Sequence, residues 1–197
     1  MEGRIVLLIA SALIAATAAG CGTSQSARFY TLDSTAVADG APATHTAVMV
    51  GPVTVPAAVD QPEFVVQDGS NRVDVEEFNR WAAPLSDGIT RAVAGDLAVL
   101  LGTPDVATAP LANFNPAYWV TIDVQRFEST PNQAALLEAV WTVRKTAGGA
   151  TRSGRTVARE AVQGEGFDAL AAAHSRALAR MSGDIAAAIR AEAGQQP

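Results

Sequence analysis

The segment Gly164-Glu165-Gly166-Phe167-Asp168-Ala169 has the spacing that most suggests chemistry in this sequence of 197 residues. It follows the pattern G-x-G-x-x-A, comes after a predicted strand and opens a predicted helix. In dinucleotide-binding proteins such a turn holds a pyrophosphate at the helix N-terminus. Here the helix is the last element, so no second strand completes a βαβ unit and no acidic residue follows on one to hold a ribose. We interpret the glycines as loop residues and predict no cofactor.

The two histidines, His45 and His174, are the other candidates for chemistry. His45 lies in a loop of Pro, Ala and Thr, whereas His174 falls inside the apolar stripe of the last helix. We interpret His174 as a hydrogen-bonded core histidine or an interface residue, because no other His or Cys can join it in a metal site. Glu76 and Glu77 would point to opposite faces of a strand, so they cannot form an acid/base pair. The sequence therefore predicts no catalytic and no metal-binding residues.

Cys21 is the only cysteine, and the residues before it are typical of a secretory signal. Arg4 gives a positive charge, 5–19 is almost entirely apolar, and small residues precede a cut site. The apolar run is shorter than the ~18 to 20 residues of a membrane-spanning helix, so removal is favoured over retention. The polar residues 22–26 would form a tether. An ordinary signal peptide with a thiol nearby is the alternative.

Residues Ala18 to Cys21 resemble a bacterial lipobox, although the commonest lipobox has Leu where this chain has Ala18. In that family the cysteine sulfur receives a diacylglycerol, the signal is cut before the cysteine, and the new amino group is acylated. The resemblance predicts lipidation of Cys21, and several acyl chains anchor a protein more firmly than one. Gly22, rather than Asp, after the cysteine resembles lipoproteins sorted to the outer membrane. A lipidated Cys21 leaves no thiol for a disulfide.

Two amphipathic helices are predicted to support this chain. Pro84 suits the first turn of one helix, which Gly102 and Pro104 end. The other begins near Phe167 and carries its apolar stripe at steps of three and four. The stripes consist of Leu85, Ile89, Val93, Leu97 and Leu100, and of Phe167, Leu170, His174, Leu178, Met181, Ile185 and Ile189. Each helix has one apolar stripe, so both are expected to pack on the same face of a sheet.

Short strands are predicted at 28–32, 48–50, 64–67, 72–75, 118–125, 137–143 and 156–163. Asp68-Gly69 marks a hairpin, Arg126-Phe127 marks a bulge, Ser153-Gly154 marks a turn, and the charged last strand suits a sheet edge. We predict an α+β fold: a two-layer α/β domain with a mixed sheet of five or six strands and two helices on one face. The expected division is a signal peptide at 1–20, a lipidated tether at 21–27, the domain at 28–192 and a frayed tail at 193–197.

Asn71-Arg72 and Arg80-Trp81, followed by Pro84, form a candidate partner interface. A tryptophan beside an arginine, just before a helix, either closes the core or is an exposed anchor, since Trp and Arg are enriched at binding hot spots. Both alternatives stay open on the sequence. The formal net charge of -6 gives no general electrostatic reason to bind nucleic acid.

Several of these segments together resemble the ABC-type transport auxiliary lipoprotein family, the PqiC-like proteins. The most specific match is Arg-Trp-Ala-x-Pro-Leu, within 78–85. The remaining matches, in the same order as in the family, are 51–56, 71–73, 98–102, 124–128, 174–178 and 182–186. The chain departs from the pattern at Ala83, where an acidic residue is expected, and at Trp119, where a more polar pattern is usual.

The resemblance implies an outer-membrane lipoprotein that faces the periplasm and works with MCE-domain proteins and an ABC transporter or inner-membrane partner. Such systems move lipids, phospholipids above all, between the two membranes. It implies a non-enzymatic docking or channel-end subunit that can form a homo-oligomeric ring, with ATP used by another subunit. A structural or assembly lipoprotein of another envelope complex, such as a secretin or the outer-membrane insertion machinery, is the alternative function.

Overall fold

The computed structural model describes residues 25–194. Within these residues, two helices and eight strands follow one another. In chain order they are β1 (Arg28–Tyr30), β2 (Val48–Thr54), β3 (Glu63–Gln67), β4 (Val73–Trp81), α2 (Leu85–Leu101), β5 (Val106–Ala107), β6 (Tyr118–Thr130), β7 (Ala134–Lys145), β8 (Thr151–Ala161) and α3 (Gly166–Ala193). Cys21 lies outside the described residues.

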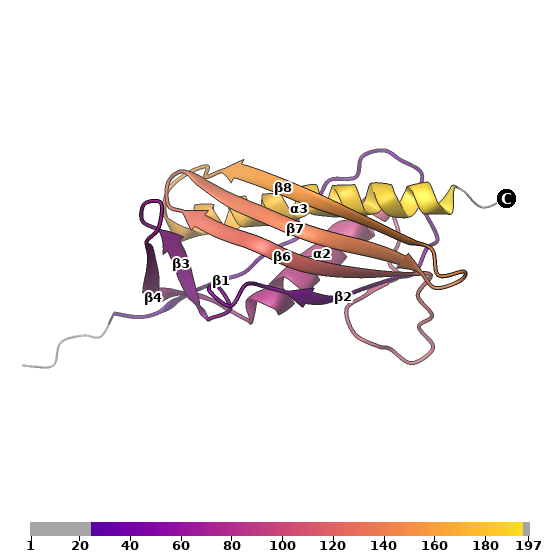
Figure 1. Ribbon diagram of the computed structural model, residues 1–197, viewed down its shortest axis with the longest axis horizontal. Coiled ribbons are helices and arrows are strands. Elements are labelled where there is room, and N and C mark those ends of the chain that lie inside the picture. Colours follow the sequence, from indigo (N-terminus) through magenta and orange to yellow (C-terminus); the bar gives the residue numbers. More distant parts are fainter. Residues whose placement is uncertain (1–24, 195–197) are drawn as a thin grey trace, which may run out of the picture.

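Strand β6 is the centre of the eight-stranded sheet (Figure 1). One edge of β6 pairs antiparallel with β7, which in turn pairs with β8. The first half of its other edge pairs in parallel with β2, whereas Ser129 near its end pairs with Val66 of β3. The sheet therefore divides on this side into two branches, β2–β5 and β3–β4–β1.

A bulge in β6 decides which of its side chains reach the core. Before it, the buried residues are at even positions, from Tyr118 to Val124. The pairing register with β7 shifts between Val124 and Arg126, which confirms the predicted bulge. After the shift, Phe127 and Ser129 are the buried residues, because one extra residue reverses the alternation of a strand.

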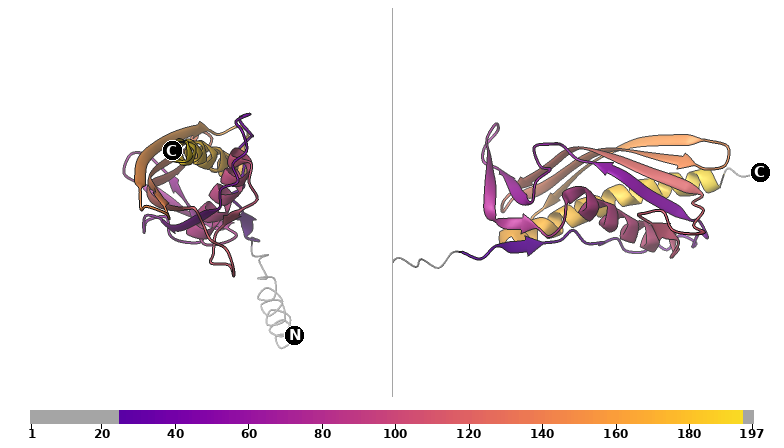
Figure 2. Two further views of the ribbon diagram at one scale, coloured as in Figure 1. Left: turned by 90° about the vertical axis from the view of Figure 1, so that its right-hand side faces the viewer. Right: turned by 90° about the horizontal axis from the view of Figure 1, so that it is seen from below.

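Both helices cover the same face of the sheet, which curls around them in the end-on view of Figure 2. Helix α2 follows Pro84 and ends at Gly102, whose left-handed φ of 61° glycine adopts readily. It packs against α3 and β2, while α3 packs against β7 and β8. The predicted α+β fold, with two helices on one face of a mixed sheet, is confirmed.

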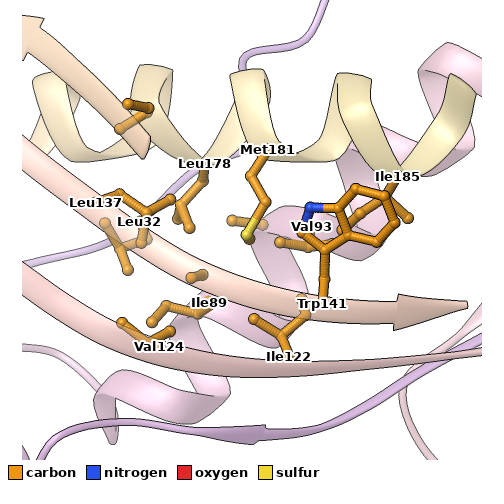
Figure 3. Packing of buried hydrophobic residues seen from close by; sticks show 14 of the residues in the cluster. Leu32, Ile89, Val93, Ile122, Val124, Leu137, Trp141, Leu178, Met181 and Ile185 are labelled. Carbon is orange, nitrogen blue, oxygen red and sulfur yellow. The ribbon is translucent and has the colours of Figure 1, made fainter. Parts of the chain in front are cut away.

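The core lies between the helices and the concave face of the sheet (Figure 3). Ile89 and Val93 of α2 and Leu178 and Ile185 of α3 are fully buried there. Residues of β6 and β7, including Trp141, face them across the layer. Both predicted apolar stripes are buried, apart from Leu100 and Phe167, which are partly exposed. At the end of α2, Leu101 is buried in place of the predicted Leu100.

The structure corrects the prediction at Ser153-Gly154. These residues lie inside β8, which begins at Thr151, rather than in a turn. A Cβ atom at Gly154 would lie 2.2 Å from Cζ2 of Trp141, so glycine leaves room there for the indole ring. The sheet has eight strands rather than five or six, and β5, with only two residues, has no counterpart among the predicted strands.

A strap, residues 31–47, links β1 to β2 and crosses both helices. Its anchor is the fully buried carboxylate of Asp96 on α2. Oδ1 of Asp96 accepts hydrogen bonds from Ser34 Oγ, Thr35 N and Ala36 N, each at 2.9 Å. Oδ2 accepts one from Ser182 Oγ of α3 at 3.0 Å. One side chain thus joins the strap and both helices.

We expect Asp96→Ala to lower the free energy of unfolding by about 2 kcal/mol, because it removes hydrogen bonds to a charged acceptor and leaves their donors unpaired. Amide exchange at Thr35 and Ala36 should rise with it. Asp105→Ala is the control, since Asp105 is exposed and its side chain accepts no hydrogen bond within the described residues. Equal losses of stability in the two variants, measured by urea unfolding, would contradict the anchoring role of Asp96.

Candidate functional site

The candidate site is the corner where β4 ends and α2 begins. Two neighbours hold its backbone: Trp81 N donates to Pro62 O at 2.6 Å, and Ala82 N donates to Tyr30 O at 2.8 Å. Pro84 then starts the helix, and its carbonyl oxygen accepts from the amides of Asp87 and Gly88 at 3.0 Å. The corner is therefore fixed by β1, by the loop before β3 and by α2.

Trp81 closes the core at this corner, the first of the two alternatives that the sequence left open. Only 7% of its surface is exposed. Its ring stacks on Phe64 at a centroid distance of 3.9 Å and meets Phe127 edge-on at 6.1 Å. As a fixed ring in the core, Trp81 shapes the surface beside it rather than projecting from it.

A pocket of about 410 Å³ opens beside Trp81. We call it the corner pocket, and it is bounded by Asp60, Gln61, Pro62, Trp81, Ala82, Ala83, Pro84 and Leu85. Its walls are mostly apolar side chains, with the carboxylate of Asp60 as its one charged group. Such a concave apolar surface with few polar groups suits the insertion of an apolar side chain from a partner.

The five predicted interface residues fall into two groups. Arg80, Trp81 and Pro84 meet at the corner, where Arg80 Nη2 lies 2.7 Å from Glu63 Oε1 in an ion pair. Asn71 and Arg72 lie at the β3–β4 turn, at the opposite end of β4, where Arg72 pairs with Asp68. Trp81 and Pro84 line the corner pocket, so the structure brings together only part of the predicted set.

The other wall of the corner pocket was missed in the sequence. Asp60, Gln61 and Pro62 precede β3 and lie about twenty positions before the residues that they face. They reach Trp81 because Pro62 O accepts its amide and Glu63 pairs with Arg80. Proline beside a predicted strand was a signal for a chain turn, but not for a contact with Trp81.

His174 is a core residue, as one of the two sequence interpretations held. It is fully buried, stacks on Phe127 at 3.9 Å, and its Nε2 lies 2.8 Å from Ser129 Oγ. Burial lowers the pKa of His174 to about 3, because the charged ring would lose its hydration. The imidazole is neutral at physiological pH and does not reach the surface.

The glycine segment at the start of α3 borders a second pocket, of about 520 Å³, together with Pro131 and Asn132. No strand follows α3 within residues 25–194, so the βαβ arrangement of a dinucleotide site is not formed there. In the same range, no group of three or more His, Cys, Asp or Glu residues could hold a metal ion.

The fold and the corner pocket define an α+β domain with an apolar recess at one helix start. The family model described as "ABC-type transport auxiliary lipoprotein component" matches residues 30–186. The chain belongs to this family. No curated protein sequence matches it significantly.

Solved structures confirm the fold. An uncharacterised protein matches with a TM-score of 0.69 and 20% identity, covering 84% of this chain and 99% of its own. A Xanthomonas campestris protein of the family DUF330 matches with a TM-score of 0.65 and 20% identity, covering 80% of this chain and 92% of its own. A PelC dodecamer from Paraburkholderia phytofirmans is more distant, with a TM-score of 0.40, 14% identity and coverage of 70% and 91%.

Membership of a lipoprotein family implies attachment to a membrane through lipid. Within residues 25–194 there is no helix with both the length and the apolar character needed to cross one. Cys21, the predicted lipid attachment site, is separated from β1 by the short stretch 22–27.

Proposed function

We propose that this protein is a non-enzymatic accessory subunit of an MCE/ABC-type lipid transport system, anchored to the outer membrane by an acylated Cys21 and facing the periplasm. The observation that carries the proposal is the family match over residues 30–186, which makes the chain a transport auxiliary lipoprotein. The signal at 1–20, the tether at 21–27 and the frayed tail at 193–197 would flank the docking domain, 28–192. Phospholipid is the expected cargo of the whole system.

The corner pocket is the proposed contact with the MCE-domain partner. Its rim includes Pro84 and the exposed Ala82, and Arg80 lies next to it with its guanidinium turned to Glu63. A rigid apolar recess loses little conformational entropy when it is filled, which favours docking there. Asn71 and Arg72 would form a separate contact at the hairpin turn, since they lie at the other end of β4.

The proposal is tested by a pull-down of partner proteins from membranes. Wild-type protein should recover an MCE-domain protein, and Ala82→Trp should reduce the amount at least about tenfold, because the indole would fill the corner pocket. Ala187→Trp is the matched control, since Ala187 is also exposed but lies far along α3. Cys21→Ser should release the protein from the membrane and lower recovery while leaving the corner pocket unchanged.

Two results would contradict the proposal. One is wild-type protein that recovers no MCE-domain protein under conditions that preserve complexes. The other is an equal loss for Ala82→Trp and Ala187→Trp, which would remove the corner pocket from the interface. Recovery of secretin or outer-membrane insertion components instead would favour the alternative, a structural or assembly lipoprotein of another envelope complex, which the anchor and domain would suit equally well.

A further inference from the structure

Strand β4 has an unpaired edge over most of its length. Its inner edge pairs with β3, whereas β1 covers its outer edge only at 79–81. Within the described residues, the outer edge of 73–78 has no partner strand. This segment holds neither Lys nor Pro, residues that commonly protect a free edge. Its backbone groups can accept another strand.

The side chains along this free edge are apolar and acidic. Val73 and Val75 are exposed, Val75 at 54%. Val75 stands opposite Val65, which lies outside the core cluster, so both valines are on the outer face of the sheet. Glu76 stands opposite the core residue Phe64, and the exposed Glu77 follows it on the outer face, just before the pairing register with β3 shifts between Glu76 and Arg80. Neither Glu77 nor Asp74 forms an ion pair within the described residues.

The other end of the same sheet is also free and carries the opposite charge. In the part of the chain that the structure describes, strand β8 pairs only with β7. Its outward residues include Arg155, Val157 and Arg159, and Val157 is 59% exposed. Arg155 forms an ion pair with Glu138 of β7, whereas Arg159 has no ion pair among the described residues. The inward residues of β8 face α3, so only the outer face and the free edge are open to a partner.

The two edges match in period as well as in charge. On β4 the outer face reads Val73, Val75, Glu77, and on β8 it reads Arg155, Val157, Arg159. Placing Val75 opposite Val157 puts Glu77 opposite an arginine whether the strands run parallel or antiparallel. Cross-strand pairs of apolar residues and of opposite charges both stabilise a sheet.

From these complementary edges we propose that the free edge of β4 pairs with β8 of a second copy, so that one sheet continues from molecule to molecule. The contact joins two different surfaces, and each copy keeps one edge of each kind for a further neighbour. Repetition therefore gives a closed ring or an open chain rather than a two-fold dimer. This specifies the surfaces of the homo-oligomeric ring that the family resemblance implies for the proposed accessory subunit, and it does not require the corner pocket.

Cysteine crosslinking tests the register directly. Full-length Val75→Cys and Val157→Cys variants, each purified from membranes in detergent, are mixed and oxidised. We expect a dimer linked by a disulfide between them, since directly opposed residues lie within disulfide reach. Val75→Cys mixed with Val37→Cys is the control, because Val37 is 81% exposed but lies on the strap. Crosslinking of the two pairs at the same rate would overturn the proposal.

Charge reversal tests the same contact independently. Glu77→Arg alone, and Arg155→Glu with Arg159→Glu, should each weaken self-association by at least about tenfold, because like charges would face one another. The triple variant should associate again. Molar mass is read by light scattering of the full-length protein in detergent.

A wild-type protein that stays monomeric at about 50 μM, well above the micromolar range of weak specific complexes, would overturn the proposal. So would a triple variant that shows no recovery when both parent variants have lost association. A monomer that still recovers an MCE-domain protein would remove this contact and leave the proposed function standing. An assembled protein that recovers no MCE-domain protein would support this contact and contradict the proposed function.

Discussion

Replacing Phe64 by alanine is expected to lower the free energy of unfolding by about 4 kcal/mol. Phe64 is fully buried in β3. It stacks on Trp81 and meets Tyr30 and Phe167 edge-on, with ring centroids 5.4 and 5.2 Å away. It therefore joins β1, β3, β4 and α3. Removing the ring leaves a cavity beside Trp81, which explains why the expected loss is near the upper end for a core residue.

Urea unfolding of Phe64→Ala and Phe29→Ala makes the comparison. Phe29 precedes Tyr30 in β1, but 64% of its surface is exposed. Its replacement should change stability by less than about 0.5 kcal/mol, as for other surface positions. The two variants lose the same atoms, so the difference measures burial alone. A loss for Phe64→Ala no greater than that for Phe29→Ala would show that the aromatic cluster does not hold these strands together.

A milder substitution at position 64 links stability to the proposed function. Trp81 rests on Phe64 and also forms a wall of the corner pocket. Phe64→Leu keeps an apolar side chain there and should cost less, about 1 to 1.5 kcal/mol. If this milder variant stays folded yet recovers less partner than Phe29→Ala, the position of Trp81 contributes to docking.

Acid is expected to destabilise this protein through His174 by about 3 kcal/mol between pH 7 and pH 4. The pKa of His174 is lowered to about 3 in the folded state by burial, against about 6.5 in an unfolded chain. Between these values the unfolded chain binds a proton that the folded protein does not, so stability falls as pH falls. The slope is about 1.4 kcal/mol per pH unit, and the contribution is constant above about pH 7.

The stability of wild type, His174→Gln and His45→Gln should be compared by urea unfolding from pH 7 to pH 4. Glutamine at position 174 does not titrate and still offers Ser129 a hydrogen-bonding group, so this variant should show a slope shallower by about 1.4 kcal/mol per pH unit. His45 is exposed in the strap, and His45→Gln is the matched control because it leaves His174 and its neighbours in place. Identical slopes in wild type and His174→Gln would show that His174 is protonated in the folded state.

Local patterns in the sequence predicted most elements correctly. The apolar stripes of α2 and α3, the β3–β4 hairpin, the alternation of β6 and its bulge are confirmed, because each depends on residues only a few positions apart. The start of β8 was wrong because Gly154 looks like a turn residue locally. Position 154 requires glycine because Trp141 of the neighbouring strand β7, thirteen positions earlier in the sequence, occupies the space that a side chain would need.

The candidate site was only partly predictable. Arg80, Trp81 and Pro84 are close in sequence, and the structure keeps them together at the corner. Asn71 and Arg72 are almost as close in sequence, but an extended strand carries them away, since each residue of a strand adds about 3.3 Å. Asp60–Pro62, which form the other wall of the corner pocket, belong to a loop whose position is set by the pairing between β3 and β4, which local sequence patterns do not reveal.

The sequence by itself determined the family, the two helices on one face of a sheet, and a predicted lipid anchor at Cys21. These depend on short motifs and on the periods of helices and strands, which neighbouring residues establish alone. Only the tertiary structure decided that Trp81 is a core residue, that Asp96 holds the strap, and that β4 and β8 leave edges of opposite charge. Each of these follows from contacts between distant segments, whose burial and pairing exist only once the chain has folded.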